Sequence, residues 1–135
     1  MRAFREAVEA GDLAAVEALL AEDVVFTSPV VFKPYPGKAI TAAILRAVSE
    51  VFEDFRYERE LAGDAGRDHA LVFTARVGER TLTGCDFIHL DDDGLIDELT
   101  VMVRPLSGAQ ALAAAMGARF DEIVKEAEAR SVPAS

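Results

Sequence analysis

The sequence predicts an α+β domain in which helices come first, a run of antiparallel strands follows, and a further helix ends the chain. Apolar residues recur at helical spacing up to about residue 52 and again from about residue 107, whereas they alternate with polar residues between about 55 and 104. Segregated helices and strands are typical of the α+β class. The length of 135 residues suits a single domain, 1–135, with a core at about 2–106 and a C-terminal helix at about 107–130.

Two short helices are expected at the N-terminus. The first covers about residues 2–10, with Phe4 and Val8 as its apolar stripe. Gly11 ends this helix, and the carboxylate of Asp12 is placed to cap the next one. The second helix carries apolar residues on one side, which predicts a face toward the core; these are Leu13, Val16, Leu19 and Leu20.

A short strand, a loop and a third helix come next. Residues 24–27 have the composition of a strand, and the Ser-Pro pair that follows closes it because proline cannot donate to a ladder. The third helix covers about 38–52, with an ion pair between Arg46 and Glu50 expected on its outer side. Four of its apolar residues are predicted to face the core: Ile40, Ile44, Val48 and Phe52.

The period of the pattern changes from 3.6 to 2 after Asp54. Alternation of apolar and polar residues predicts strands at about 55–61, 71–77, 80–90 and 98–104. Gly78 marks a tight turn between the second and third of these strands. Asp93-Gly94 predicts a hairpin turn before the last strand, because Asp-Gly tolerates the positive φ that such turns require.

One helix is predicted after the strands. Ser107 and Gln110 have the spacing of a capping box, and the helix is expected to run to about Ala129. Its apolar positions follow helical spacing: Leu112, Met116, Phe120, Ile123 and Val124.

The composition excludes several classes of partner. A net charge of −10 argues against nucleic acid, since no basic stripe exists to neutralise phosphates, and it disfavours anionic membrane surfaces as well. No apolar run approaches the ~20 residues that span a bilayer. Cys85 is the only cysteine, so no internal disulfide forms and a reducing compartment is expected. The N-terminus is charged and periodic rather than a signal peptide, which predicts a cytoplasmic protein.

Two motifs carry a family resemblance. The first is Ala10-Gly11-Asp12, followed by Leu19-Leu20-Ala21-Glu22-Asp23-Val24 and Ser28-Pro29; the second is Asp86-Phe87-Ile88-His89-Leu90-Asp91-Asp92-Asp93-Gly94-Leu95-Ile96. With the order of the elements, they make about residues 2–106 resemble the nuclear transport factor 2-like superfamily, which includes ketosteroid isomerases, polyketide cyclases and limonene epoxide hydrolases. The resemblance implies a cone, in which a strongly bent antiparallel or mixed sheet wraps around N-terminal helices and leaves a cavity open at one end.

The resemblance to ketosteroid isomerase extends to one of three catalytic groups. Those enzymes use a carboxylate base in an Asp-Pro pair and an oxyanion hole formed by a tyrosine and a protonated aspartic acid. Asp86 matches the aspartic acid, whereas Ser28 stands at the position of the base and Phe4 at that of the tyrosine. Serine is a poor base at neutral pH and phenylalanine donates no hydrogen bond, so an unmodified ketosteroid isomerase mechanism is not expected.

The alternation of the strand independently makes Asp86 the main polar candidate of the cavity. Asp86 shares a strand face with Ile88 and Leu90, while Cys85, Phe87 and His89 form the opposite face. An aspartate facing an apolar cavity has its pKa raised by desolvation unless a cation or several donors meet it. The alternative is a structural hydrogen bond to a nearby backbone or hydroxyl group.

Tyr57, Ser28 and Tyr35 are the candidates for a second polar group beside Asp86. Each has a plainer interpretation: packing for Tyr57, a turn or cap for Ser28, and an aromatic anchor of a rigid loop for Tyr35. Five apolar residues are expected to line or fill the cone: Phe26, Phe73, Ile88, Val101 and Val103. No metal site or cofactor is expected, because His69 and His89 stand isolated and the lone cysteine gives no zinc pattern.

The convex sheet face and the cavity lead to the functional expectations. The residues of this face are mixed but weakly charged, which predicts a homodimer through it, as the resemblance also implies; they are Val72, Thr74, Phe87, His89, Thr100 and Met102. Three functions stay open. The protein is an enzyme acting on a small, largely apolar molecule through Asp86, a non-catalytic pocket for such a molecule, or a protein-association domain with an incidental cavity.

Overall fold

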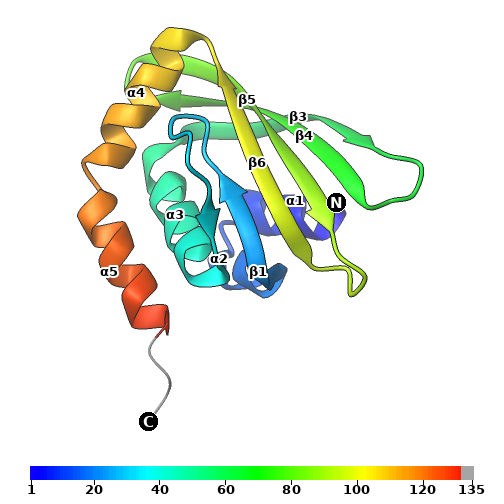
Figure 1. Ribbon diagram of the computed structural model, residues 1–135. Coiled ribbons are helices and arrows are strands. Elements are labelled where there is room, and N and C mark those ends of the chain that lie inside the picture. Colours follow the sequence, from blue (N-terminus) through cyan, green and yellow to red (C-terminus); the bar gives the residue numbers. More distant parts are fainter. Residues whose placement is uncertain (132–135) are drawn as a thin grey trace.

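The computed structural model describes residues 1–131. Its helices are α1 (Arg2–Ala10), α2 (Leu13–Ala18), α3 (Lys38–Val51), α4 (Leu106–Gly117) and α5 (Phe120–Ser131). Its strands are β1 (Leu20–Thr27), β2 (Tyr35–Pro36), β3 (Glu53–Ala62), β4 (Asp68–Val77), β5 (Arg80–Leu90) and β6 (Ile96–Arg104). The predicted order of helices, strands and a C-terminal helical segment is therefore confirmed (Figure 1).

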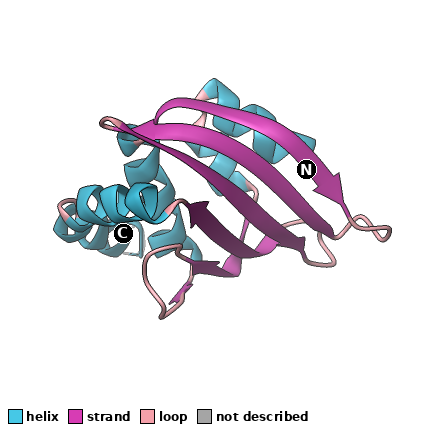
Figure 2. Cartoon of the chain, turned by 90° about the horizontal axis from the view of Figure 1, so that it is seen from above, coloured by secondary structure: helices cyan, strands magenta, loops and turns pink. Residues whose placement is uncertain are grey.

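The strands form one mixed sheet in the order β2-β1-β6-β5-β4-β3. Only β1 and β6 pair in parallel among the described strands, because the chain passes through α3 and three strands before β6 returns beside β1. The sheet is strongly bent, and α1 lies behind β5 and β6 in the view of Figure 1. Figure 2 shows the curvature of the long strands from above. This arrangement confirms the expected cone of the α+β class.

The N-terminal helices follow the prediction up to Ala18. Gly11 ends α1 with a φ of 70°, and the Asp12 carboxylate accepts a hydrogen bond from the Ala15 N–H at 3.1 Å. The prediction that Leu19 and Leu20 belong to the second helix is wrong. Leu20 instead begins β1, where it is buried and pairs with Ile96 of β6. An apolar residue at this position fits the core side of a helix or of a strand, and pairing with β6 decides for the strand.

The ion pair predicted within α3 is replaced by one pair to α5 and one to the α4–α5 turn. Arg46 binds Glu126 at 2.8 Å, and Glu50 binds Arg119. Helix α5 lies alongside α3 (Figure 1), which brings Glu126 of α5 to Arg46 and Arg119 of the preceding turn to Glu50. The two pairs hold the C-terminal helix against α3.

The long strands show the predicted alternation with one exception. The inward residues of β4 are all buried: Leu71, Phe73, Ala75 and Val77. Leu61, expected on the apolar face of β3, is instead exposed. The register of β3 against β4 shifts between Tyr57 and Arg59, so the alternation that holds at Tyr57 does not continue to Leu61.

The C-terminal segment forms two helices rather than one. Helix α4 ends at Gly117 and α5 begins at Phe120, and the capping box predicted from Ser107 is absent because the helix already begins at Leu106. Pro105 precedes it in an extended conformation without a side-chain cap. Ser107 therefore lies inside the first turn, where it cannot act as N-cap. Over residues 1–131, no helix combines the length and apolarity needed to cross a membrane.

Candidate functional site

A cavity of about 510 Å³ lies between the inner face of the sheet and the helices. Residues of all five described helices and all six described strands line it, and most of these side chains are apolar. Its polar lining residues come from distant parts of the chain: Glu9, Ser28, Tyr35, Ser49, Tyr57 and Asp86. A cavity of this size and character suits a small, largely apolar ligand with few polar groups.

Asp86 lies in the middle of β5 and faces the cavity. Its cross-strand neighbours are Leu71 of β4 and Val101 of β6, and its exposed fraction is 8%. Phe87, the next residue, is 42% exposed on the opposite face. The strand face predicted for Asp86 is thus the face that the structure shows.

Tyr57 is the second polar group that meets Asp86. Its hydroxyl donates a hydrogen bond to Oδ2 of Asp86 at 2.9 Å. The two residues lie on β3 and β5, with β4 between them, so the Tyr57 side chain reaches across one strand. The pair brings two titratable groups together inside an apolar cavity, which is the geometry that acid–base chemistry requires.

Burial dominates the electrostatics of the pair. Desolvation raises the pKa of Asp86 to about 7, against the lowering effect of the Tyr57 hydrogen bond. Burial also raises the pKa of Tyr57, and the charge and hydrogen bond of Asp86 raise it further. Near neutral pH, Asp86 therefore exchanges readily between its neutral and ionised forms, whereas Tyr57 stays protonated.

Aromatic rings surround the pair. Tyr57 meets the ring of Phe55 edge-on with centroids 4.9 Å apart, and the rings of Phe55 and Phe73 stack at 5.0 Å. Phe52 joins them, 5.7 Å from Phe73. The Phe73 ring lies over the backbone of Gly84, where a Cβ would come within 2.2 Å of it. Glycine at position 84 therefore allows the aromatic wall to approach β5 beside Asp86.

Helix α1 adds a charged pair near Tyr57. The guanidinium of Arg5 lies over the Tyr57 ring, 5.8 Å from its centroid, and binds Glu9 at 2.9 Å. The charge of Glu9 raises the pKa of Tyr57, and the charge of Arg5 lowers it. Glu9 also lines the cavity as a second carboxyl group, with its side chain 49% exposed and paired with Arg5.

The remaining predicted site residues divide into two groups. Ser28, Tyr35, Phe26, Phe73 and Val101 line the cavity, as does Phe4. Ile88 and Val103 do not line the cavity. Ile88 is buried in the core, and Val103 is partly buried against the core. The Ser28 hydroxyl accepts the Val30 N–H at 3.1 Å, which agrees with the interpretation of Ser28 as a turn residue.

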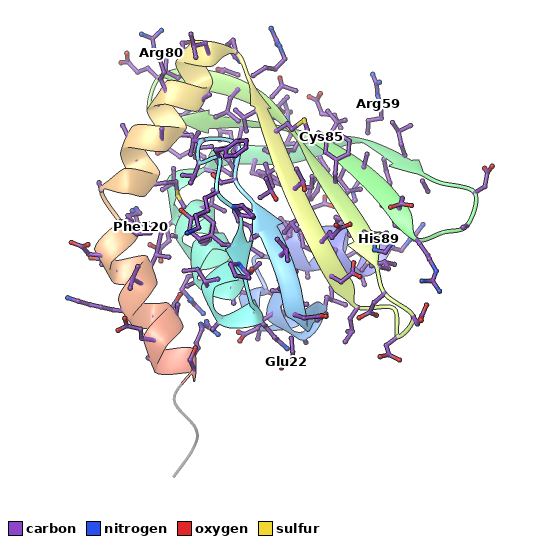
Figure 3. All side chains as sticks on the ribbon, viewed as in Figure 1. Glu22, Arg59, Arg80, Cys85, His89 and Phe120 are labelled. Atoms are coloured by element: carbon purple, nitrogen blue, oxygen red, sulfur yellow. The ribbon has the colours of Figure 1, made fainter. Side chains whose placement is uncertain are left out.

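Several lining residues were not predicted from the sequence. Glu9 belongs to a helix with a polar outer face, and its position at the end of α1 beside the α1–α2 turn brings it to the cavity. Phe120, at the α4–α5 junction (Figure 3), lines the cavity and lies 6.4 Å from the ring of Tyr35. The break between the two helices was not expected, so neither was this contact.

His89 is not isolated, contrary to expectation. It lies on β5 (Figure 3), and its Nδ1 lies 2.6 Å from Asp97, with Glu98 close by. The Asp97 carboxylate raises the pKa of His89 through this hydrogen bond. The cluster is on the convex side, away from Asp86, and an ion pair explains it.

Comparisons with known proteins agree with this architecture. The SnoaL-like domain matches residues 1–99. A steroid delta-isomerase from Pseudomonas aeruginosa is 47% identical, with 90% of this chain and 89% of that chain covered and a TM-score of 0.85. A bacterial protein with a cystatin-like fold from Silicibacter pomeroyi is 39% identical, with 94% and 91% covered and a TM-score of 0.86.

More distant structures share the fold. An NTF2-like protein from Cytophaga hutchinsonii is 20% identical, with 77% of this chain and 86% of that chain covered and a TM-score of 0.61. No curated protein matches the sequence. The cone, the cavity and the family match together lead to one conclusion: the chain belongs to the SnoaL-like domain family of NTF2-like proteins.

Proposed function

We propose that the protein binds a small, largely apolar molecule in the cavity and that Asp86, held by Tyr57, acts on the polar group of that molecule. The observation that carries this proposal is the 2.9 Å hydrogen bond between two titratable side chains inside an apolar cavity of about 510 Å³. A purely structural role would not require such a cavity, because core interiors are otherwise packed with few voids larger than a water molecule.

Two observations favour an isomerase that moves a proton from one atom of its substrate to another. A neutral Asp86 can donate a hydrogen bond to a carbonyl oxygen on which negative charge develops, and its pKa of about 7 keeps the neutral form populated. The relative that is 47% identical is a steroid delta-isomerase. Glu9 is the other carboxyl group of the lining and would be the base that takes a proton from one carbon and returns it to another.

The proposed function predicts that filling the cavity abolishes ligand binding. Val101 and Val103 lie on one face of β6, but only Val101 lines the cavity. We expect Val101→Phe to weaken binding of the neutral probe 5-androstene-3,17-dione at least about 10-fold, because the added ring occupies ligand space. Val103→Phe adds the same volume outside the cavity and should change binding by less than about 3-fold. Calorimetry gives the affinities, and circular dichroism checks that both variants fold.

The same probe separates binding from catalysis. Absorbance of the conjugated enone product reports conversion, so binding with conversion supports the isomerase and binding alone supports a binding protein. Absence of binding to the wild-type protein, or equal binding by both phenylalanine variants, would contradict the proposed site.

We also propose a homodimer through the convex face of the sheet. Phe87 of β5 is 42% exposed and Met102 of β6 is 59% exposed, and both project away from the cavity. Their neighbours across β5 and β6 are Thr100 and Cys85, which carry no charge at neutral pH. An outward sheet face with this composition is suited to a second copy of the chain.

Phe87→Glu should convert this dimer to a monomer, since two carboxylates would be buried at the interface without partners. Sedimentation velocity measures the change. Phe32 is fully exposed in the loop after β1, so Phe32→Glu is a matched control that leaves the dimer intact. A monomeric wild-type protein, or a Phe87→Glu variant that stays dimeric, would refute this interface.

A further inference from the structure

The cavity contains carboxyl groups but no basic side chain. Among the described residues that line it, none is Lys, Arg or His, whereas Glu9 and Asp86 contribute carboxyl groups. The chain also carries a net charge of −10. An anion entering this cavity would lose its hydration and meet no cation in return, which makes its binding unfavourable.

Asp86 has an oxygen available to a ligand. Tyr57 occupies Oδ2, and no hydrogen bond joins Oδ1 to another group within residues 1–131. Among the side-chain polar atoms of these residues that are fully buried, Nε of Arg130 is the one without a hydrogen-bond partner. Oδ1 of Asp86 also has no partner, so it is not fully buried. Because Asp86 lines the cavity, Oδ1 is reachable from it. An ionised carboxylate accepts hydrogen bonds only, so it requires a donor from the ligand.

The walls beside Asp86 are suited to positive charge. Tyr57, Phe55, Phe73 and Phe52 form a continuous group of rings, with neighbouring centroids 4.9 to 5.9 Å apart. The faces of aromatic rings attract cations through their quadrupole. Arg5 lies over the Tyr57 ring but is bound by Glu9, so it supplies no free counter-charge to Asp86.

We propose that the cavity also binds a lipophilic amine when Asp86 is ionised; the protonated nitrogen of the amine donates to Oδ1 of Asp86 and lies against the aromatic rings. The inference rests on the proposed function, namely that the cavity binds a small, largely apolar molecule. It adds a second class of ligand, which uses the ionised form of Asp86 where the carbonyl of the proposed isomerase substrate uses the neutral form. A neutral alcohol or ketone can form a hydrogen bond with Asp86 but brings no charge for the aromatic rings. A carboxylate would meet the acidic lining without a cation to balance it.

Binding of an amine is coupled to a proton. The titratable groups around Asp86 are Tyr57 from β3, Cys85 beside it in β5, and Arg5 and Glu9 from α1 around the Tyr57 ring. A bound ammonium lowers the pKa of Asp86 from its value of about 7 in the free protein. Binding at about pH 6 therefore releases close to one proton, and binding at about pH 9 releases none.

Three probes with the same hydrocarbon cage test the proposal: 1-adamantanamine, 1-adamantanol and adamantane-1-carboxylate. In calorimetry at about pH 8, we expect the amine to bind about 10- to 100-fold more tightly than the alcohol, the range of a charge-assisted hydrogen bond. The acid should give no measurable binding. Titrations in buffers of different ionisation enthalpy should show proton release at about pH 6 for the amine only.

Asp86→Asn is the diagnostic variant, because it keeps the shape and removes the charge. It should remove the preference for the amine and bring its affinity to that of the alcohol measured on the same variant. Asp64→Asn removes the same charge from an exposed site and should retain the preference.

Equal binding of amine and alcohol by the wild type, or binding of the acid, overturns the amine proposal while leaving the proposed function intact. Failure of all three probes to bind also overturns it. The proposed function is also overturned only if the neutral dione does not bind to the wild-type protein.

Discussion

Replacement of Gly84 by alanine is expected to destabilise the protein by about 2–3 kcal/mol, the upper part of the range of about 1–3 kcal/mol seen when extra atoms are forced into a well-packed interior. A Cβ at this position would lie 2.2 Å from the Phe73 ring, which is buried and packed against Phe52 and Phe55. Phe73 also lines the cavity, so the cavity offers the space into which its ring can move. We therefore expect the variant to push Phe73 toward the ligand site, so that ligand binding weakens together with stability.

Urea unfolding of Gly84→Ala, Phe73→Leu, the double variant and a control isolates this contact. Gly117→Ala is the control, because nothing lies within 4 Å of a Cβ there and alanine in a helix is favoured over glycine by up to about 1 kcal/mol. Combining Gly84→Ala with Phe73→Leu should cost less than the sum of the two single changes, since the smaller side chain makes room for the new methyl group. Additive costs would show that Phe73 does not cover Gly84.

Asp86→Asn is expected to stabilise the protein by about 4 kcal/mol above pH 7, even though it removes the central group of the site. The pKa of Asp86 rises from 3.8 to about 7 on folding, and each unit corresponds to about 1.4 kcal/mol. Between these two pKa values the folded state holds its proton more tightly than the unfolded state, so the wild type loses stability as pH rises through this window. Asparagine does not ionise and still accepts the Tyr57 hydrogen bond.

The difference between variant and wild type should therefore depend on pH. It should be near zero below about pH 4, where Asp86 is neutral in both states, and should grow to its full size above about pH 7. Chemical denaturation across this range measures it. Asp64→Asn at an exposed position should shift stability by less than about 0.5 kcal/mol at every pH. An Asp86→Asn variant that is less stable than wild type at high pH would mean that the buried carboxylate is well compensated.

The fold could be predicted because the periods of the sequence are strong. Alternation along β5 placed Asp86 on the inner face, and the same rule placed Phe73 in the core. Alternation could not distinguish Val101 from Val103, which share a face of β6, although only Val101 lines the cavity. Nor did it find the α4–α5 break, because a single glycine such as Gly117 is tolerated inside a helix and the apolar residues keep helical spacing beyond it.

The pairing of Tyr57 with Asp86 lies beyond sequence reasoning for a geometric reason. Tyr57 pairs with Phe73, and Phe73 pairs with Gly84, so Tyr57 and Asp86 are two strands apart and offset by two residues along β5. The tyrosine side chain spans this offset, and no alternation rule predicts a contact between residues two strands apart. Glu9 reaches the cavity from the end of α1, which sheet alternation does not describe either.

Titration of the Asp86 carboxyl group by carbon-detected NMR is the decisive measurement for the role of this residue. We expect a pKa of about 7 in the wild type, and a still higher pKa in Tyr57→Phe, because the Tyr57 hydrogen bond stabilises the ionised form. A pKa at or below the ordinary value of 3.8 would show that Asp86 is a compensated structural carboxylate, and would contradict its role as the acid of the cavity.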